Sequence, residues 1–302
     1  MGKSSTTGMV TLLQFLATGF VWGSSYMWIA MALEDISWQF LTWIRPILGM
    51  ITLGLVLLIQ RPKDAHGFVL PRQPKIWRHY LVVGLLFTAV PSSLYALALG
   101  GISSGMVSIY SATAPLLTAL VAGLIFRVEK LGVLNWLGVI IGAAGVTLVI
   151  QPWNITEDSN FISELCVLLA VLSVAIAYVY QMKFNSEFKL HPTVIAFLIA
   201  VGASAISLVL SPWLLVGPVR ITQSSLIALA VLGILVAAYG YIWNAAVVDA
   251  WGATGASTVA YLNPIIGVLA GALVLGEQLS PIALIGGLVI FAGIAIERLH
   301  RK

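Results

Sequence analysis

Charged residues are scarce in this chain of 302 residues. Only 9% of them are Asp, Glu, Lys or Arg, against about 25% in soluble domains. A soluble protein of this length must cover its surface with polar groups, and 15 basic plus 11 acidic residues cannot do so. An apolar content of 60% and a mean hydropathy of +1.03 agree. The shortage of charge excludes an ordinary cytosolic protein and predicts an integral membrane protein.

Cysteine and mid-run acidic residues are also nearly absent. The one cysteine, Cys166, lies within an apolar run, so a disulfide framework and a thiolate metal site are excluded, and we expect no metal or cofactor. No run centre contains Asp or Glu, because Glu164, Asp249 and Glu277 lie at run ends. Proton-coupled carriers usually place such a residue within the membrane. The sequence therefore disfavours a dedicated proton relay and favours a facilitator.

The chain contains ten apolar runs, each about as long as an α-helix needs to be to cross a bilayer. Barrel strands would be about ten residues long with polar alternation. The runs lie at about 9–31, 37–59, 77–99, 102–125, 132–151, 161–183, 192–216, 223–248, 254–275 and 281–298. The predicted fold class is an all-α integral membrane protein with ten transmembrane helices.

The distribution of basic residues predicts the orientation. With the N-terminus inside, the inside segments hold thirteen Lys and Arg residues, whereas only Arg220 lies outside and Arg45 lies within a run. Lys and Arg concentrate in cytoplasmic loops, so both termini are predicted to be cytoplasmic. The bilayer accounts for the net charge of +4, and we expect no nucleic-acid partner.

An internal repeat relates the two halves of the chain. The segment from Ser108 to Pro115 resembles the segment from Ser257 to Pro264, and Glu129-Lys130-Leu131 corresponds to Glu277-Gln278-Leu279. Beyond these segments a constant offset of 148 residues pairs Gly138 with Gly286 and Gly145 with Gly293. The repeat predicts two five-helix units, residues 1–151 and 152–302.

Each unit contains five spans, an odd number, so the second unit must have the opposite orientation in the membrane. Inverted repeats of this kind are the architecture of alternating-access carriers, with the substrate site near mid-membrane at the repeat interface. We therefore expect a central cavity between the two units.

Several motifs together resemble a known family. They are Phe20-Val21-Trp22-Gly23-Ser24-Ser25, an Arg in the second run, the small-residue run ending in Ala114-Pro115, and Gly276-Glu277-Gln278-Leu279-Ser280 leading into Gly286-Gly287. In this order, with ten spans and a duplication, they resemble the EamA family of the drug/metabolite transporter superfamily. Length and topology are similar to those of its YddG-like amino-acid exporters. The resemblance implies a bacterial inner-membrane carrier, with a cavity lined mainly by the first four spans of each half.

Arg45 is the charged residue deepest in any run, about 12 Å from the start of the second span at about 1.5 Å per residue. A charge at that depth is functional by default, and a cation there would meet a substrate carboxylate. A structural role stays open: Arg45 could satisfy backbone carbonyls freed by the adjacent Pro46, or extend its charge toward the interface.

Aromatic residues within the runs suit an apolar cavity wall with polar handles. Trp22 with Tyr26, and Tyr239 with Trp243, are four apart and share a helix face. An interface belt is the competing interpretation. Two mid-membrane amides could bind substrate or join helices. The candidate substrate-binding residues are Trp22, Tyr26, Arg45, Tyr95, Tyr110, Tyr239, Trp243, Asn244, Tyr261 and Asn263.

Pro115 and Pro264 form a duplicated pair within the fourth and ninth runs. Because proline removes a helix hydrogen bond, we predict that both act as hinges, with a static kink as the alternative. Gly101-Ile102-Ser103-Ser104-Gly105 fits a hydrolase pattern, but it opens a run without a preceding strand, so we predict a turn and no enzyme.

The sequence thus predicts a carrier that exports small metabolites, above all aromatic and other neutral amino acids, by alternating access. An exporter of drugs or of other metabolites such as nucleotide sugars, and a structural protein without flux, are the alternatives. One buried arginine counts against sugar nucleotides, whose two phosphates demand more cations. The oligomeric state stays open, a monomer included.

Overall fold

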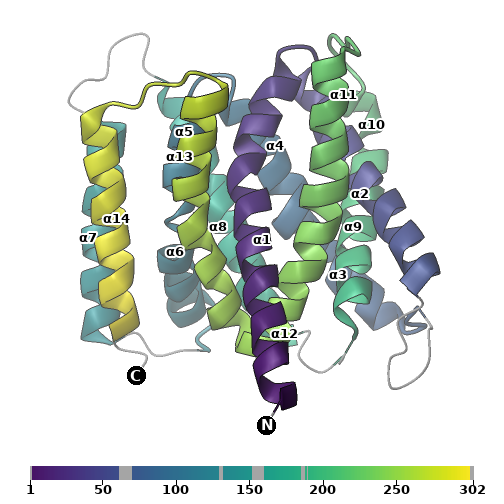
Figure 1. Cartoon of the computed structure of the whole chain (residues 1–302), viewed down its shortest axis with the longest axis horizontal. Coiled ribbons are helices and arrows are strands. Elements are labelled where there is room, and N and C mark those ends of the chain that lie inside the picture. The colour runs from purple at the N-terminus through teal and green to yellow at the C-terminus, as the bar shows by residue number, and fades with distance from the viewer. Residues whose placement is uncertain are drawn as a thin grey trace.

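The computed structural model describes residues 2–60, 70–128, 132–151, 160–184, 188 and 190–299. Within these ranges the chain is a bundle of helices, and the β pairing found there is a single bridge between Ile36 and Val219. Glu129 and Lys130, part of the predicted repeat, lie outside the described residues. Figure 1 shows the helices running side by side, with both chain ends at the same end of the bundle.

The first half contains five helical segments. They are α1 (Gly2–Leu33), α2 (Trp38–Gln60), α3 (Pro74–Gly84) continued by η1 (Leu85–Ala89) and α4 (Val90–Ala98), α5 (Ser104–Ser111) continued by α6 (Ala114–Leu120) and η2 (Val121–Ile125), and α7 (Val133–Ile150).

The second half also contains five. They are α8 (Phe161–Phe184), α9 (Pro192–Val209) with the short α10 (Ser211–Leu214), α11 (Gln223–Ala230) continued by η5 (Val231–Tyr239) and α12 (Gly240–Ser257), η6 (Thr258–Tyr261) with α13 (Leu262–Val274), and α14 (Pro281–Leu299).

The predicted membrane character is confirmed. Eight of the described segments are long and apolar enough to cross a bilayer, and two shorter apolar helices, Thr258–Val274 and Pro281–Ile296, follow them. Large apolar side chains are exposed on the outer faces, including Ile59 at 81%, Leu273 at 82% and Leu288 at 69%. Exposed apolar surface of this extent is compatible with lipid rather than water.

The predicted boundary between the eighth and ninth spans was wrong. The ninth run was expected to begin at residue 254, but α12 continues to Ser257 and α13 begins only at Leu262. The glycines of this stretch suggested a boundary, yet Gly and Ala are tolerated within a helix. The seventh span is also shorter than expected, because α9 ends at Val209 and Pro212 opens the separate α10.

Three helix irregularities lie just before prolines, whereas the π-helical η2 and η5 have no neighbouring proline and Pro46 lies within the continuous α2. Between α5 and α6 the helix is interrupted at Ala112 and Thr113, directly before Pro115. The π-helical η1 precedes Pro91, and the 3-10 segment η6 precedes Pro264. Proline cannot donate to the carbonyl four residues earlier. Near the α5–α6 break, the hydroxyls of Ser111 and Thr113 donate to the Ser108 and Tyr110 carbonyls at 2.7 and 2.8 Å.

The repeat-matched glycines meet in the structure. An added Cβ at Gly293 would lie 2.6 Å from the Gly138 oxygen, and one at Gly286 would lie 2.9 Å from the Gly145 oxygen. Gly138 of α7 thus meets the later glycine of α14, and Gly145 meets the earlier one. The two helices are therefore antiparallel and pack backbone to backbone. Each contact is the repeat counterpart of the other, as expected for halves related by an axis perpendicular to these helices.

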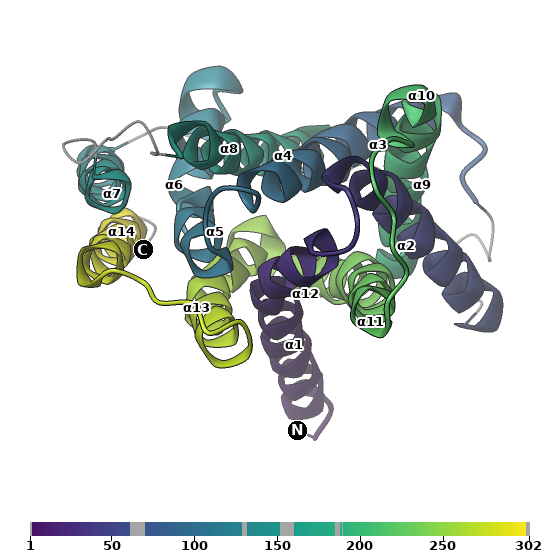
Figure 2. The ribbon, with the colours of Figure 1, turned by 90° about the horizontal axis from the view of Figure 1, so that it is seen from above.

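The pair α7 and α14 lies at one side of the molecule. Seen from above in Figure 2, the other helices surround the centre and this pair stands apart from them. A buried cluster built on Leu53, Tyr80 and Phe87 joins helices around the centre, and another built on Tyr110, Val167 and Ile290 attaches α14 to them.

Candidate functional site

A central cavity of about 110 Å³ lies among the helices of both halves. Its lining comes from α1, α2, η1, α4, α5, α6, α8, η5, α12, η6 and α13. None of the described lining residues belongs to α7, α14 or α9. The expectation that the fifth and tenth spans contribute less to the lining agrees with this, whereas the seventh span, expected to contribute, does not reach the cavity.

Arg45 lines this cavity from the middle of α2. Its electrostatic neighbours are the hydroxyls of Tyr26, Tyr95 and Tyr241. No described Asp or Glu lines the cavity, and the buried Nε of Arg45 has no hydrogen-bond partner among the described residues. The guanidinium therefore carries an uncompensated positive charge next to the cavity, in an environment where an anion would be stabilised.

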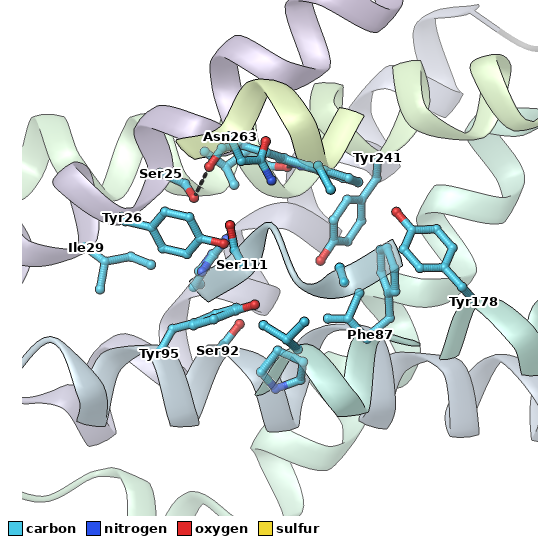
Figure 3. A pocket seen from close by; sticks show the side chains of 18 of the residues that line it. Ser25, Tyr26, Ile29, Phe87, Ser92, Tyr95, Ser111, Tyr178, Tyr241 and Asn263 are labelled. Atoms are coloured by element: carbon cyan, nitrogen blue, oxygen red, sulfur yellow. Dashed lines mark hydrogen bonds between the residues drawn. The ribbon is translucent and has the colours of Figure 1, made fainter. Parts of the chain in front are cut away.

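Hydroxyl groups and an amide surround the same space. Tyr26 and Tyr95 pack edge to face with ring centroids 5.2 Å apart, and Ser25, Ser92 and Ser111 lie around them. In Figure 3 the labelled side chains of Tyr26, Tyr95, Ser92 and Ser111 face one another across one part of the cavity. Asn263, only 8% exposed, adds an amide whose Oδ1 lacks a partner in the described part of the chain.

Irregular backbone borders the cavity on two sides. Pro115 cannot bond to the carbonyl of Ser111, and Pro264 cannot bond to that of Ala260; both carbonyl-bearing residues line the cavity. Non-helical backbone at membrane depth is tolerated where it lines a cavity. The duplicated prolines thus mark matching breaks at the cavity wall, and their hinge role stays a prediction.

An aromatic septum closes one end of the central cavity. We use this name for Phe87, Tyr178 and Tyr241, which line both this cavity and a second one. Phe87 contacts Tyr178 and Tyr241 at centroid distances of 5.0 and 5.7 Å, and Trp22 packs edge to face on Tyr241 at 5.9 Å. The Tyr241 hydroxyl lies 2.8 Å from Thr88 Oγ1, a hydrogen bond that holds the ring in place.

The second, inner cavity has a volume of about 370 Å³ and lies beyond the septum. Its lining includes Met182 near the end of α8 and Pro192 at the start of α9. It therefore lies toward the end of the bundle that holds both chain ends in Figure 1. The septum stands between this inner cavity and Arg45.

The structure distributes the sequence-predicted residues unevenly. Trp22, Tyr26, Arg45, Tyr95 and Asn263 line the central cavity, whereas Asn244 lines the inner one.

Four further candidates line neither cavity. Tyr110 is fully buried beside the Glu164 carboxyl group. The rings of Tyr239 and Trp243 pack against each other in a tilted arrangement with centroids 5.7 Å apart, and Tyr261 packs on Phe291 at 6.3 Å. The Tyr239–Trp243 contact lies within one continuous helical segment, and the Tyr261–Phe291 contact joins two helices.

The sequence places Tyr178 and Tyr241 among the aromatic residues within the runs that suit a cavity wall, but neither was selected as a candidate binding residue. Tyr241 lies two positions from both Tyr239 and Trp243, on nearly the opposite face of the helix. The i, i+4 spacing of Tyr239 and Trp243 indicated a face that does not line the cavity. This helix is apolar on all sides, so periodicity does not reveal which face points inward. Ser25, Ser92 and Ser111 were missed because small hydroxyl residues are common in membrane helices.

A multi-pass helical protein with a buried cation in a central cavity has the features of a membrane carrier. The model of the EamA-like transporter family matches this chain twice, at residues 9–151 and 161–297. The chain therefore belongs to the EamA-like transporter family.

Curated relatives agree with this assignment. The chain is 25% identical over 288 residues to the uncharacterized transporter YoaV of Bacillus subtilis strain 168, covering 94% of each chain. It is 27% identical over 280 residues to the uncharacterized inner membrane transporter YedA of Escherichia coli K12, covering 91% of this chain and 87% of the relative. A protein of known crystal structure shares the fold with a TM-score of 0.64 at 19% identity, over 96% of both chains.

Proposed function

We propose that this protein is a carrier that exports neutral amino acids, aromatic ones included, from the cytoplasm through its central cavity. The observation that carries the proposal is Arg45, a cation without a described carboxylate partner in a cavity walled by tyrosine rings and hydroxyls. A charge-assisted bond from a guanidinium is the strongest means of recognising a carboxylate. Aromatic walls with a few convergent polar groups suit an apolar side chain.

The proposed transport cycle is alternating access by two inverted five-helix repeats, residues 1–151 and 152–302. The antiparallel pairing of α7 and α14 through repeat-matched glycines supports this division. The thirteen Lys and Arg residues of the inside segments support cytoplasmic termini in the inner membrane. In this orientation the inner cavity opens toward the cytoplasm and the septum separates it from the central site.

Uptake into proteoliposomes tests the proposal. Labelled Phe, Trp, Met and Thr are offered to the purified, reconstituted protein with and without an imposed pH gradient. Saturable flux without a gradient is the expected result, because no described carboxylate lines the central cavity to bind a coupling proton. Flux only with a gradient would overturn the facilitator mechanism. Absence of flux for every amino acid would overturn the substrate class in favour of drugs or other metabolites.

A further inference from the structure

The inner cavity differs from the central one in charge. Its described lining contains the Asp249 carboxylate and the amides of Gln181 and Asn244, but no Lys or Arg. The central cavity has the opposite arrangement, with Arg45 and no described carboxylate. Acidic and amide oxygens accept hydrogen bonds and suit a cationic group, whereas the guanidinium suits an anionic one. The two cavities are therefore complementary to the two ends of a zwitterion.

Asn244 supplies a buried acceptor beside Tyr178 of the septum. Its side chain is 7% exposed, its amide lies beside the Tyr178 hydroxyl, and its Oδ1 has no hydrogen-bond partner among the described residues. A buried acceptor without a donor is costly. An ammonium group, with three N–H donors, would satisfy it.

The remaining wall of the inner cavity is aliphatic. Leu190, Ile195 and Ile199 line it, and the last two lie four residues apart on one face of α9. Such a wall stabilises an apolar group attached to the ammonium, because it removes the apolar surface of that group from water.

We propose that the inner cavity is a second binding site, which recognises a primary ammonium group bearing an apolar substituent. The substrate is first held there by Asn244 and Asp249, with its side chain against the α9 wall. Movement of the septum then passes the carboxylate to Arg45. This inference rests on the proposed export of amino acids, and it divides recognition of the zwitterion between two sites on opposite sides of the septum.

The lone cysteine makes a direct test possible. Cys166→Ser removes the native thiol, and Ala245→Cys then places a single reporter in the inner cavity wall. The rate of labelling by a small neutral maleimide is measured for the full chain in nanodiscs. The added probes are phenethylamine, which lacks the carboxylate of phenylalanine, and 3-phenylpropanoate, which lacks its ammonium. Gln73→Cys, exposed just before α3 and outside both cavities, is the matched control.

The expected result is selective protection by the amine. At ten times its dissociation constant, phenethylamine should slow labelling of Ala245→Cys about tenfold, since only the unoccupied fraction reacts. 3-Phenylpropanoate should give no protection at the same concentration, and neither probe should change labelling of Gln73→Cys. Asp249→Asn, which keeps the side-chain size, should raise the phenethylamine concentration needed for half protection by about tenfold.

Failure of protection by phenethylamine, or equal protection by both analogues, would overturn the proposal. Val248→Cys, at another lining position, repeats the measurement if the first variant does not fold. Phenylalanine flux is measured separately in the Cys166→Ser background. Flux without amine protection would reject the second site alone, whereas amine protection without flux would reject the exported substrate and retain the site.

Discussion

Replacing Arg45 with Ala separates a binding role from a structural one. The guanidinium lines the central cavity without a described carboxylate partner, and its Nε makes no hydrogen bond there. A hydrogen bond to a charged group contributes about 1.5–3 kcal/mol. At about 1.4 kcal/mol per factor of ten, loss of the substrate carboxylate contact should weaken apparent affinity about 10- to 150-fold. Initial rates of phenylalanine uptake over a range of concentrations measure this.

Thermal stability provides the second readout. Removing an uncompensated buried cation leaves no described anion unpaired, so Arg45→Ala should melt at the wild-type temperature or above it. Arg45→Lys keeps the charge but loses the planar set of donors, so its apparent affinity for phenylalanine should lie between those of the wild type and Arg45→Ala. Arg220→Ala, which removes an exposed cation outside both cavities, is the matched control and should leave flux unchanged. Unchanged affinity in Arg45→Ala, or parallel loss of folding and flux, would refute the binding role.

Three further substitutions test the packing and the septum. The Glu277 carboxylate accepts hydrogen bonds from the Ser104 and Gly105 backbone N–H groups at 2.8 and 2.9 Å. Glu277→Gln should therefore lower the free energy of unfolding by about 1–3 kcal/mol and lower the melting temperature, and an unchanged melting temperature would contradict this. Gly145→Leu would place Cβ 2.7 Å from the Ile290 backbone nitrogen, so it should destabilise the protein by at least about 1–3 kcal/mol; an unchanged melting temperature would argue against this close contact. Tyr241→Phe loses the 2.8 Å hydrogen bond to Thr88, which contributes about 1 kcal/mol. If the septum controls access to the central cavity, this change should speed maleimide labelling of a cysteine introduced at Ser92 about fivefold. An unaltered labelling rate would show that the septum does not control access.

The helices could be predicted from the sequence because hydrophobic length determines which segments cross a bilayer. Most boundaries lay within a few residues of those observed. Two boundaries differ more: the seventh span ends early, at Val209, and the eighth continues to Ser257 as part of α12. Glycine weakens a helix by only about 1 kcal/mol relative to alanine, and packing in the bundle overrides that preference.

The candidate site was less predictable. Arg45 could be found because a charge within an apolar run is a strong signal by itself, and Trp22 and Tyr26 could be found from their shared face. The septum could not be predicted as a unit, because its residues come from three segments far apart in the sequence. Only packing brings Phe87, Tyr178 and Tyr241 together. Helices that are apolar on every side carry no periodic mark of their inward face.

The glycine contacts between α7 and α14 have a mechanical consequence. They join the two halves backbone to backbone along one edge of the molecule, where an added methyl group would already collide. If the halves turn against each other, this seam is the stiffest line about which they can do so. Displacement then grows with distance from the seam, as along a lever. The helices α2 and α9, on the far side in Figure 2, would travel farthest for a given angle. Two helices that never touch the cargo would thus set the leverage of the whole cycle.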